Sequence, residues 1–168
     1  MIILFSSKLP QQGKDTAVSY LGKMYGVKRI AFADKLKDTA TSLGWNGEKD
    51  EKGRQFLIDL GLAARKYEQN TWVNLAIKDV KDLIKNGYAV AISDVRFLNE
   101  VNKIHEAFTR TKIIHIGINS DTLGDKSREN NESQIDYEKM NFDYTINTTE
   151  NVSHLYKEID NILLHINR

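Results

Sequence analysis

The sequence contains no cysteine and only one proline in 168 residues. Without cysteine, the chain can form neither a disulfide framework nor a thiolate metal site. It also lacks an apolar run long enough to cross a membrane, and its apolar N-terminal run is far too short for a signal peptide. These absences predict a soluble, cytoplasmic protein.

An excess of charge of one sign is lacking as well. The 24 basic residues nearly balance the 23 acidic residues, which leaves a net charge of +1. Because no global field would attract nucleic acid or an anionic membrane, neither is expected as a partner, and any phosphate must be bound by a local cluster of charges. Apolar residues make up 40% and charged residues 28% of the chain, a globular balance that predicts one domain over residues 1–168.

Short apolar segments alternate with segments of helical spacing along the chain. This order predicts an α/β fold with three layers and a parallel sheet of about five strands, in which ligands bind beyond the carboxyl ends of the strands. Residues 119–141 interrupt the alternation, since they are polar with little periodicity, and we expect them to form a mobile lid. The expected strands are residues 2–5, 28–33, 88–93, 112–118 and 144–147, with helices starting near residues 14, 34, 55, 71, 97 and 151.

The most informative stretch is residues 1–21. An apolar strand is followed by a loop and then by Gly13-Lys14-Asp15-Thr16, which opens a helix. This is the layout of a phosphate-binding P-loop, because backbone N–H groups and the helix dipole favour an anion at the helix N-terminus. Lys14 adds an ammonium that can follow a phosphoryl group. The residues expected at the phosphates are Lys8, Gln12, Gly13, Lys14, Asp15 and Thr16.

This stretch departs from G-x-x-x-x-G-K-[ST] at two positions. Lys8 stands at the first glycine, and Asp15 stands at the Ser/Thr position with Thr16 after it. If position 8 needs a positive φ, lysine is strained there; if the loop has a path with negative φ, helped by Pro10, the Lys8 side chain is free to approach phosphate. We expect the second path. Either Asp15 or Thr16 is the metal ligand, and the sequence leaves both open.

Four arginines lie in or beside segments expected at the carboxyl rim of the sheet. Arginine suits phosphate because its planar fork can hold two phosphate oxygens at once, although a lone arginine is more often a surface residue. Arg96 stands out because it follows a strand that appears buried in the pattern of apolar residues. The four are Arg54, Arg65, Arg96 and Arg128.

Three other rim residues have alternative interpretations. Asp94 either holds Mg²⁺ through water, orients Arg96 or the acceptor sugar, or caps the helix that begins near Phe97. Asp34 either caps a helix or, with Lys37, binds the molecule that accepts the phosphoryl group. Trp72 either stacks on a base or packs in the core, as an aromatic at helical spacing more often does.

Several segments together resemble the deoxynucleoside monophosphate kinases of bacteriophages. They are GKDT at 13–16, FADKLK at 32–37, GRQFLIDLGLAAR at 53–65, WV at 72–73, ISDVRFLNE at 92–100 and INTT at 146–149. The resemblance implies a nucleoside monophosphate kinase fold, in the host cytoplasm if the chain is phage-encoded. It also implies transfer of the ATP γ-phosphoryl group, with Mg²⁺, to a deoxynucleoside monophosphate. A homodimer is left open.

Residues and resemblance together give three sets of site residues. The catalytic set is Lys14, Arg65, Arg96, Asp94 and Arg128; the acceptor-binding set is Asp34, Lys37, Arg54, Arg65, Trp72, Asp94 and Arg96; the metal set is Asp15, Thr16 and Asp94.

Two other functions remain open. One is a different small-metabolite P-loop kinase that resembles dephospho-CoA kinase. The other is a non-catalytic nucleotide-binding module with a decayed loop, which Lys8 and Asp15 motivate. The series of arginines argues against the module, because a decayed enzyme has no physical need for these charges near one rim.

Overall fold

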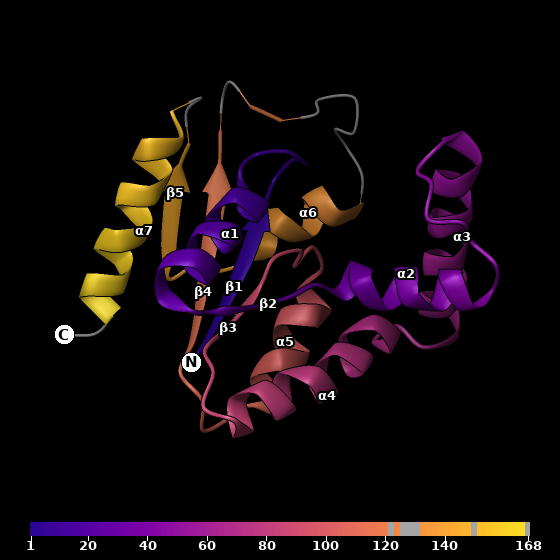
Figure 1. Cartoon of the computed structure of the whole chain (residues 1–168), viewed down its shortest axis with the longest axis horizontal. Coiled ribbons are helices and arrows are strands. Elements are labelled where there is room, and N and C mark those ends of the chain that lie inside the picture. The colour runs from indigo at the N-terminus through magenta and orange to yellow at the C-terminus, as the bar shows by residue number, and fades with distance from the viewer. Residues whose placement is uncertain (121–122, 125–131, 149–150, 167–168) are drawn as a thin grey trace.

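The computed structural model describes residues 1–120, 123–124, 132–148 and 151–166. In these residues, five strands form one parallel sheet with the order β2-β3-β1-β4-β5 (Figure 1). The strands are β1 (Ile2–Ser7), β2 (Lys28–Ile30), β3 (Val90–Ile92), β4 (Ile113–Asn119) and β5 (Tyr144–Asn147). The helices are α1 (Lys14–Tyr25), α2 (Phe32–Ser42), α3 (Glu51–Tyr67), α4 (Thr71–Lys85), α5 (Leu98–Ala107), α6 (Glu132–Lys139) and α7 (Val152–Ile166).

A hydrophobic core covers each face of the sheet. Because successive strand residues point to opposite faces, Ile3 and Phe5 of β1 pack on the side of α1 and α7, whereas Ile2 and Leu4 pack on the side of α4 and α5. All four side chains are fully buried. The continuous apolar run at the N-terminus is therefore a central strand, and the predicted three-layer α/β fold with five parallel strands is confirmed.

The start of α2 differs from the prediction. The sequence pattern suggested a strand over residues 28–33 and a helix capped by Asp34. Instead, β2 ends at Ile30 and α2 begins at Phe32 with Ala31 as its N-cap, so Asp34 lies inside the first turn. The prediction that Asp34 caps the helix is wrong, because the Asp94 carboxylate, which follows β3, accepts the first N–H groups of α2.

The predicted lid is only partly described. Within residues 119–141, β4 reaches Asn119 and α6 occupies Glu132–Lys139, so the expectation of an irregular segment is wrong for these parts. Residues 121–122 and 125–131 lie outside the described residues. The α6 helix is tied to the rim of the sheet, since Tyr137 donates a hydrogen bond to Asn119 and Asp136 accepts one from the Leu98 N–H.

Helix α3 stands apart from the sheet, at the end of α2 (Figure 1). Its buried positions are Gly53 and Gly61, and a Cβ at Gly61 would lie 3.6 Å from Leu36 of α2. Ile58 and Leu62 of α3 are each about half exposed. None of the described helices is long and apolar enough to span a membrane.

A buried histidine in the sheet makes stability depend on pH. His115 is 3% exposed, its Nε2 lies 2.9 Å from Ser6 Oγ, and its Nδ1 has no hydrogen-bond partner among the residues that the structure describes. Burial lowers the pKa of His115 to about 4. The unfolded chain takes up this proton near pH 6.5, whereas the folded chain takes it up only near pH 4. As the pH falls from 6.5 to 4, the free energy of unfolding should therefore decrease by about 1.4 kcal/mol per pH unit.

Urea unfolding at several pH values from 7 to 4 would measure this dependence. The His115→Gln variant cannot take up the proton and should show a correspondingly shallower loss. Parallel profiles for the two proteins would assign the acid sensitivity to other groups.

Candidate functional site

The loop between β1 and α1 has the backbone shape of an anion site. Gly13 has φ 101° and is the N-cap of α1, where no side chain caps the first turn. Gln11 also has a positive φ, of 64°, whereas Lys8 does not. The expectation of a negative φ at Lys8 is therefore confirmed. The residues of the loop with a positive φ are Gln11 and Gly13 instead. An uncapped helix N-terminus leaves its first N–H groups available to an anion.

Lys14 is a half-buried cation at this N-terminus. Its ammonium donates a hydrogen bond to Ser7 Oγ, and no carboxylate in the described part of the chain is close enough to form an ion pair with it. Burial and, to a smaller extent, the positive charge of Arg96 lower its pKa to about 8, against the opposing effect of Asp15 and Asp94. Sequence reasoning missed Ser7, which the end of a buried strand places there.

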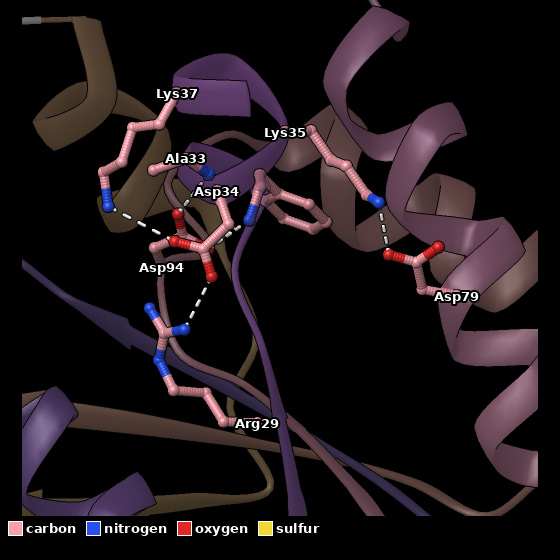
Figure 2. A network of polar contacts seen from close by, with 8 residues as sticks. Arg29, Ala33, Asp34, Lys35, Lys37, Asp79 and Asp94 are labelled. Carbon is pink, nitrogen blue, oxygen red and sulfur yellow. Dashed lines mark hydrogen bonds and ion pairs between the residues drawn. The ribbon is translucent and has the colours of Figure 1, made fainter. Parts of the chain in front are cut away.

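Asp94 is used structurally at the end of β3. Its Oδ1 accepts the Phe32 N–H at 2.9 Å and its Oδ2 accepts the Ala33 N–H at 2.8 Å, so the carboxylate caps α2 (Figure 2). Burial raises the pKa of Asp94, while these two N–H groups oppose the change. The alternative in which Asp94 caps the helix near Phe97 is wrong: it caps α2. Each carboxylate oxygen accepts one N–H group and keeps a lone pair, so a contact to Mg²⁺ through water stays a prediction.

Glu100 organises the segment that carries Arg96. Its carboxylate is 7% exposed and accepts the N–H groups of Arg96 and Phe97 at 2.8 and 3.0 Å. Burial raises its pKa to about 7. The Arg96 side chain itself is exposed at the rim. Sequence reasoning assigned no role to Glu100, although an acidic residue three positions after a helix start is a known capping pattern.

The two arginines of α3 differ in their surroundings. Arg65 is half-buried and lies 5.2 Å from the centre of the Phe97 ring, next to the segment that carries Arg96. Arg54 is exposed, and its Nε donates to the Lys49 carbonyl at 2.8 Å. The structure thus brings Arg65 towards Arg96 and leaves Arg54 on the helix surface. Arg128 lies outside the described residues.

Asp34 belongs to a surface network of charges at the start of α2 (Figure 2). Its carboxylate accepts from Arg29 at 2.6 Å and from Lys37 at 3.2 Å. Arg29 comes from β2, which the sequence did not connect with Asp34. In a second pair, Lys35 of the same helix contacts Asp79 of α4.

Trp72 lies in the core rather than at the rim. It is 5% exposed, packs with the α4 and α5 side of the sheet, and its Nε1 donates to the Gly61 carbonyl at 3.4 Å. The core interpretation of this residue therefore fits, and the prediction that its ring stacks on a base does not.

A cavity of about 430 Å³ adjoins the other side of the loop. Lys8 borders it and forms a 3.0 Å ion pair with Glu138 of α6, so the Lys8 ammonium is directed away from Lys14. Aromatic and amide side chains line the rest, including Tyr137, Phe142 and Asn147. Among the described residues, no three His, Asp or Glu side chains form a group suited to a metal ion. Asp15 and Thr16, which the sequence predicts as alternative metal ligands, lie in the first turn of α1.

Comparisons with known proteins agree with this architecture. No family model matches the chain. A UPF0200 protein of Thermococcus sibiricus is 30% identical over 115 residues, which is 67% of this chain and 56% of that relative. The chain thus spans little more than half the length of this curated relative.

The similar solved structures are kinases. Dephospho-CoA kinase from Campylobacter jejuni has a TM-score of 0.60 at 16% identity and covers 98% of this chain and 96% of its own. Shikimate kinase from Aquifex aeolicus has a TM-score of 0.56 at 15% identity, and the match covers 98% of this chain and 97% of that kinase. The chain therefore has the fold of P-loop kinases. None of these three proteins is a bacteriophage deoxynucleoside monophosphate kinase, so that finer assignment rests on the sequence motifs alone.

The position of Lys8 leads to a prediction about the loop. Since Lys8 has no positive φ and its ammonium pairs with Glu138, Lys8→Gly should not raise activity or stability. It should weaken ATP binding modestly, because glycine gives the unliganded loop more conformational freedom. Calorimetric titration with ATP and thermal unfolding would check this. A clear gain in both stability and kcat/KM would show instead that this is a damaged standard P-loop.

Proposed function

We propose that this protein is an ATP-dependent phosphotransferase that converts a deoxynucleoside monophosphate into the diphosphate. One observation supports this most directly: Lys14 lies half-buried at a helix N-terminus without a side-chain cap, and Arg96 is near enough to contribute to the lowering of its pKa. Two like charges placed together are costly unless an anion joins them. The phosphates of ATP supply such an anion, and transfer of the γ-phosphoryl group requires cations from more than one direction.

The loop and α1 are the proposed donor site. Backbone N–H groups around Gly13 and the ammonium of Lys14 would hold the phosphates, and the uncapped first turn fits this role. Mg²⁺, when bound, would neutralise charge on the phosphates. Asp15 and Thr16 of the first turn are the residues that would hold it, while Asp94 is occupied with α2.

The acceptor site is proposed between β3 and α3. Arg65 and Arg96 approach from two elements and would grip the acceptor phosphate and the transferred group. The Asp34–Lys37 pair at the start of α2 is the proposed contact to the rest of the acceptor. Half-exposed Ile58 and Leu62 of α3 offer apolar surface near these arginines, which suits a nucleobase.

A coupled ADP-release assay with all four deoxynucleoside monophosphates and the matching ribonucleotides tests this function. We expect turnover with at least one deoxynucleotide and a lower kcat/KM for its ribonucleotide. Comparable values for dGMP and GMP, or for dTMP and UMP, would remove the deoxy preference. Absence of ATP binding in calorimetry would contradict a kinase function altogether.

A second candidate is a small-metabolite kinase with a hydroxyl acceptor. The structural likeness to dephospho-CoA kinase favours it, and Asp34 offers a carboxylate at the rim that can accept a hydroxyl proton. Adding dephospho-CoA to the same assay separates the two candidates. Turnover of dephospho-CoA without turnover of any nucleotide would select the second.

A further inference from the structure

The Gln12 side chain is enclosed inside the loop. It is 2% exposed, although it lies one residue before Gly13 in the stretch that faces the proposed phosphates. Its Oε1 accepts the Leu9 N–H at 2.9 Å, and its Nε2 donates to the carbonyls of Ser120 at 3.0 Å and Leu123 at 3.3 Å. One amide group thus connects the beginning of the loop with the segment after β4.

The same set of hydrogen bonds reaches Lys14. The Leu9 carbonyl accepts a hydrogen bond from Ser7 Oγ at 2.6 Å, and Ser7 Oγ in turn accepts one from the Lys14 ammonium. Gln12 therefore accepts the N–H of Leu9, while Ser7 donates to the carbonyl of the same residue and accepts from Lys14. A shift of Leu9 would disturb the group that orients the ammonium.

Packing around the amide leaves little space for an alternative loop shape. A Cβ at Gly124 would lie 3.0 Å from Leu9 Cβ and 3.3 Å from Gln12 Cγ. On the other side, Thr148 Oγ1 donates to the Gln12 carbonyl at 3.2 Å. A non-glycine residue with positive φ, as at Gln11, persists only where surrounding contacts determine the backbone. The contacts of Gln12 are such constraints.

We propose that Gln12 is a positioning residue that fixes the donor loop, and Lys14 through Ser7, in the shape that binds ATP phosphates. Its side chain acts from behind the loop and does not contact the nucleotide. This role rests on the proposed function, because it concerns the same donor site. Among the described residues, these hydrogen bonds include neither the Arg65 nor the Arg96 side chain, although the charge of Arg96 acts on Lys14, so we expect acceptor binding to depend on them far less than ATP binding does.

The test compares Gln12→Met with the unmodified protein. Methionine has a similar size and fills the space, but it cannot replace the three hydrogen bonds. We expect the Kd and KM for ATP to rise by about tenfold or more, with the acceptor KM unchanged. The Leu9 amide should also lose protection from hydrogen exchange, measured by NMR without any nucleotide. Thr148→Val, which removes the contact to the Gln12 carbonyl, should change ATP affinity in the same direction and by less, and it keeps the test available if Gln12→Met fails to fold.

Val80→Ala serves as the control for lost stability. Val80 is fully buried in α4, away from the loop, so this variant should lower the melting temperature without changing the KM for ATP. If Gln12→Met exposes the Leu9 amide but leaves ATP affinity unchanged, the positioning role is wrong while a kinase function stands. Equal changes in both substrate KM values would also overturn it. If the unmodified protein binds no ATP, the proposed function itself fails, and the two failures are thus distinguishable.

Discussion

Replacing Lys14 with alanine is expected to lower kcat/KM for phosphoryl transfer by at least ~100-fold. The ammonium lies half-buried at the N-terminus of α1 and is bonded to Ser7, and under the proposed function it follows the group being transferred. Kinetic assays with saturating acceptor would measure the loss. Lys23→Ala, at an exposed position in the last turn of the same helix, is the control and should keep full activity.

The Lys14→Ala variant should not destabilise the fold. Lowering the pKa of Lys14 from 10.5 to about 8 costs the folded protein roughly 3 kcal/mol below pH 8, because the charge is buried there at the expense of its hydration. Lys14→Ala removes this cost, so its melting temperature should be equal or higher. A large drop in melting temperature would show that Lys14 is a structural residue and would undermine the kinetic interpretation.

The unmodified protein should also bind ATP less tightly as the pH rises above about 8. In the protein without ATP, the Lys14 ammonium loses its proton above this pH. Bound phosphates favour the protonated ammonium, so ATP binding at high pH must be accompanied by uptake of a proton. Lys14→Ala should lack this part of the pH dependence. Calorimetry in buffers of different ionisation enthalpy would detect the proton.

Replacing Arg65 or Arg96 with alanine is expected to lower kcat/KM by about 100-fold or more, which corresponds to ~3 kcal/mol of transition-state stabilisation. Arg65 belongs to α3 and Arg96 to the segment after β3, and the proposed function places both side chains at the acceptor phosphate. The effect should appear in kcat as well as in KM, because the charge they stabilise grows during transfer. Arg110→Ala, at an exposed site after α5, is the control.

The melting temperatures separate catalytic from structural loss. Arg96 is exposed and its fold contacts are made by its backbone N–H, so Arg96→Ala should leave stability unchanged. Arg65→Ala loses a cation–π contact with Phe97 and should cost about 0.5–1 kcal/mol. Unchanged kinetics in either variant would assign that arginine to the surface alone.

The positions of the helices and strands followed closely from local patterns. The apolar run of β1, the helical spacing of α4 and α7, and the Gly13-Lys14 start of α1 all lie where the sequence indicates them. Alternation of short strands with helices was enough to predict the parallel sheet, because parallel neighbours need a crossover between them. The phosphate loop was visible despite Lys8 and Asp15, since its position after the first strand does not depend on single residues.

The partners of individual polar side chains were decided by tertiary structure. Asp94 caps α2 from sixty residues away, and this displaced Asp34 from its expected role. No local pattern could show that contact, because strand order brings the end of β3 beside the start of α2. The burial of Trp72 has the same origin: the helical spacing was clear, but only the packing of α4 against the sheet showed which side its ring faces.

The residues around Lys14 illustrate the difference most directly. The motif alone predicted that Lys14 lies at a helix N-terminus, because a short motif specifies the local backbone. Ser7 and Gln12 lie in the same stretch as Lys14, but the charge of Arg96 comes from the segment after β3 and the carbonyls that hold Gln12 come from the segment after β4. Their effects on the pKa and orientation of the ammonium depend on distance and burial, which exist only once the sheet has brought those parts together.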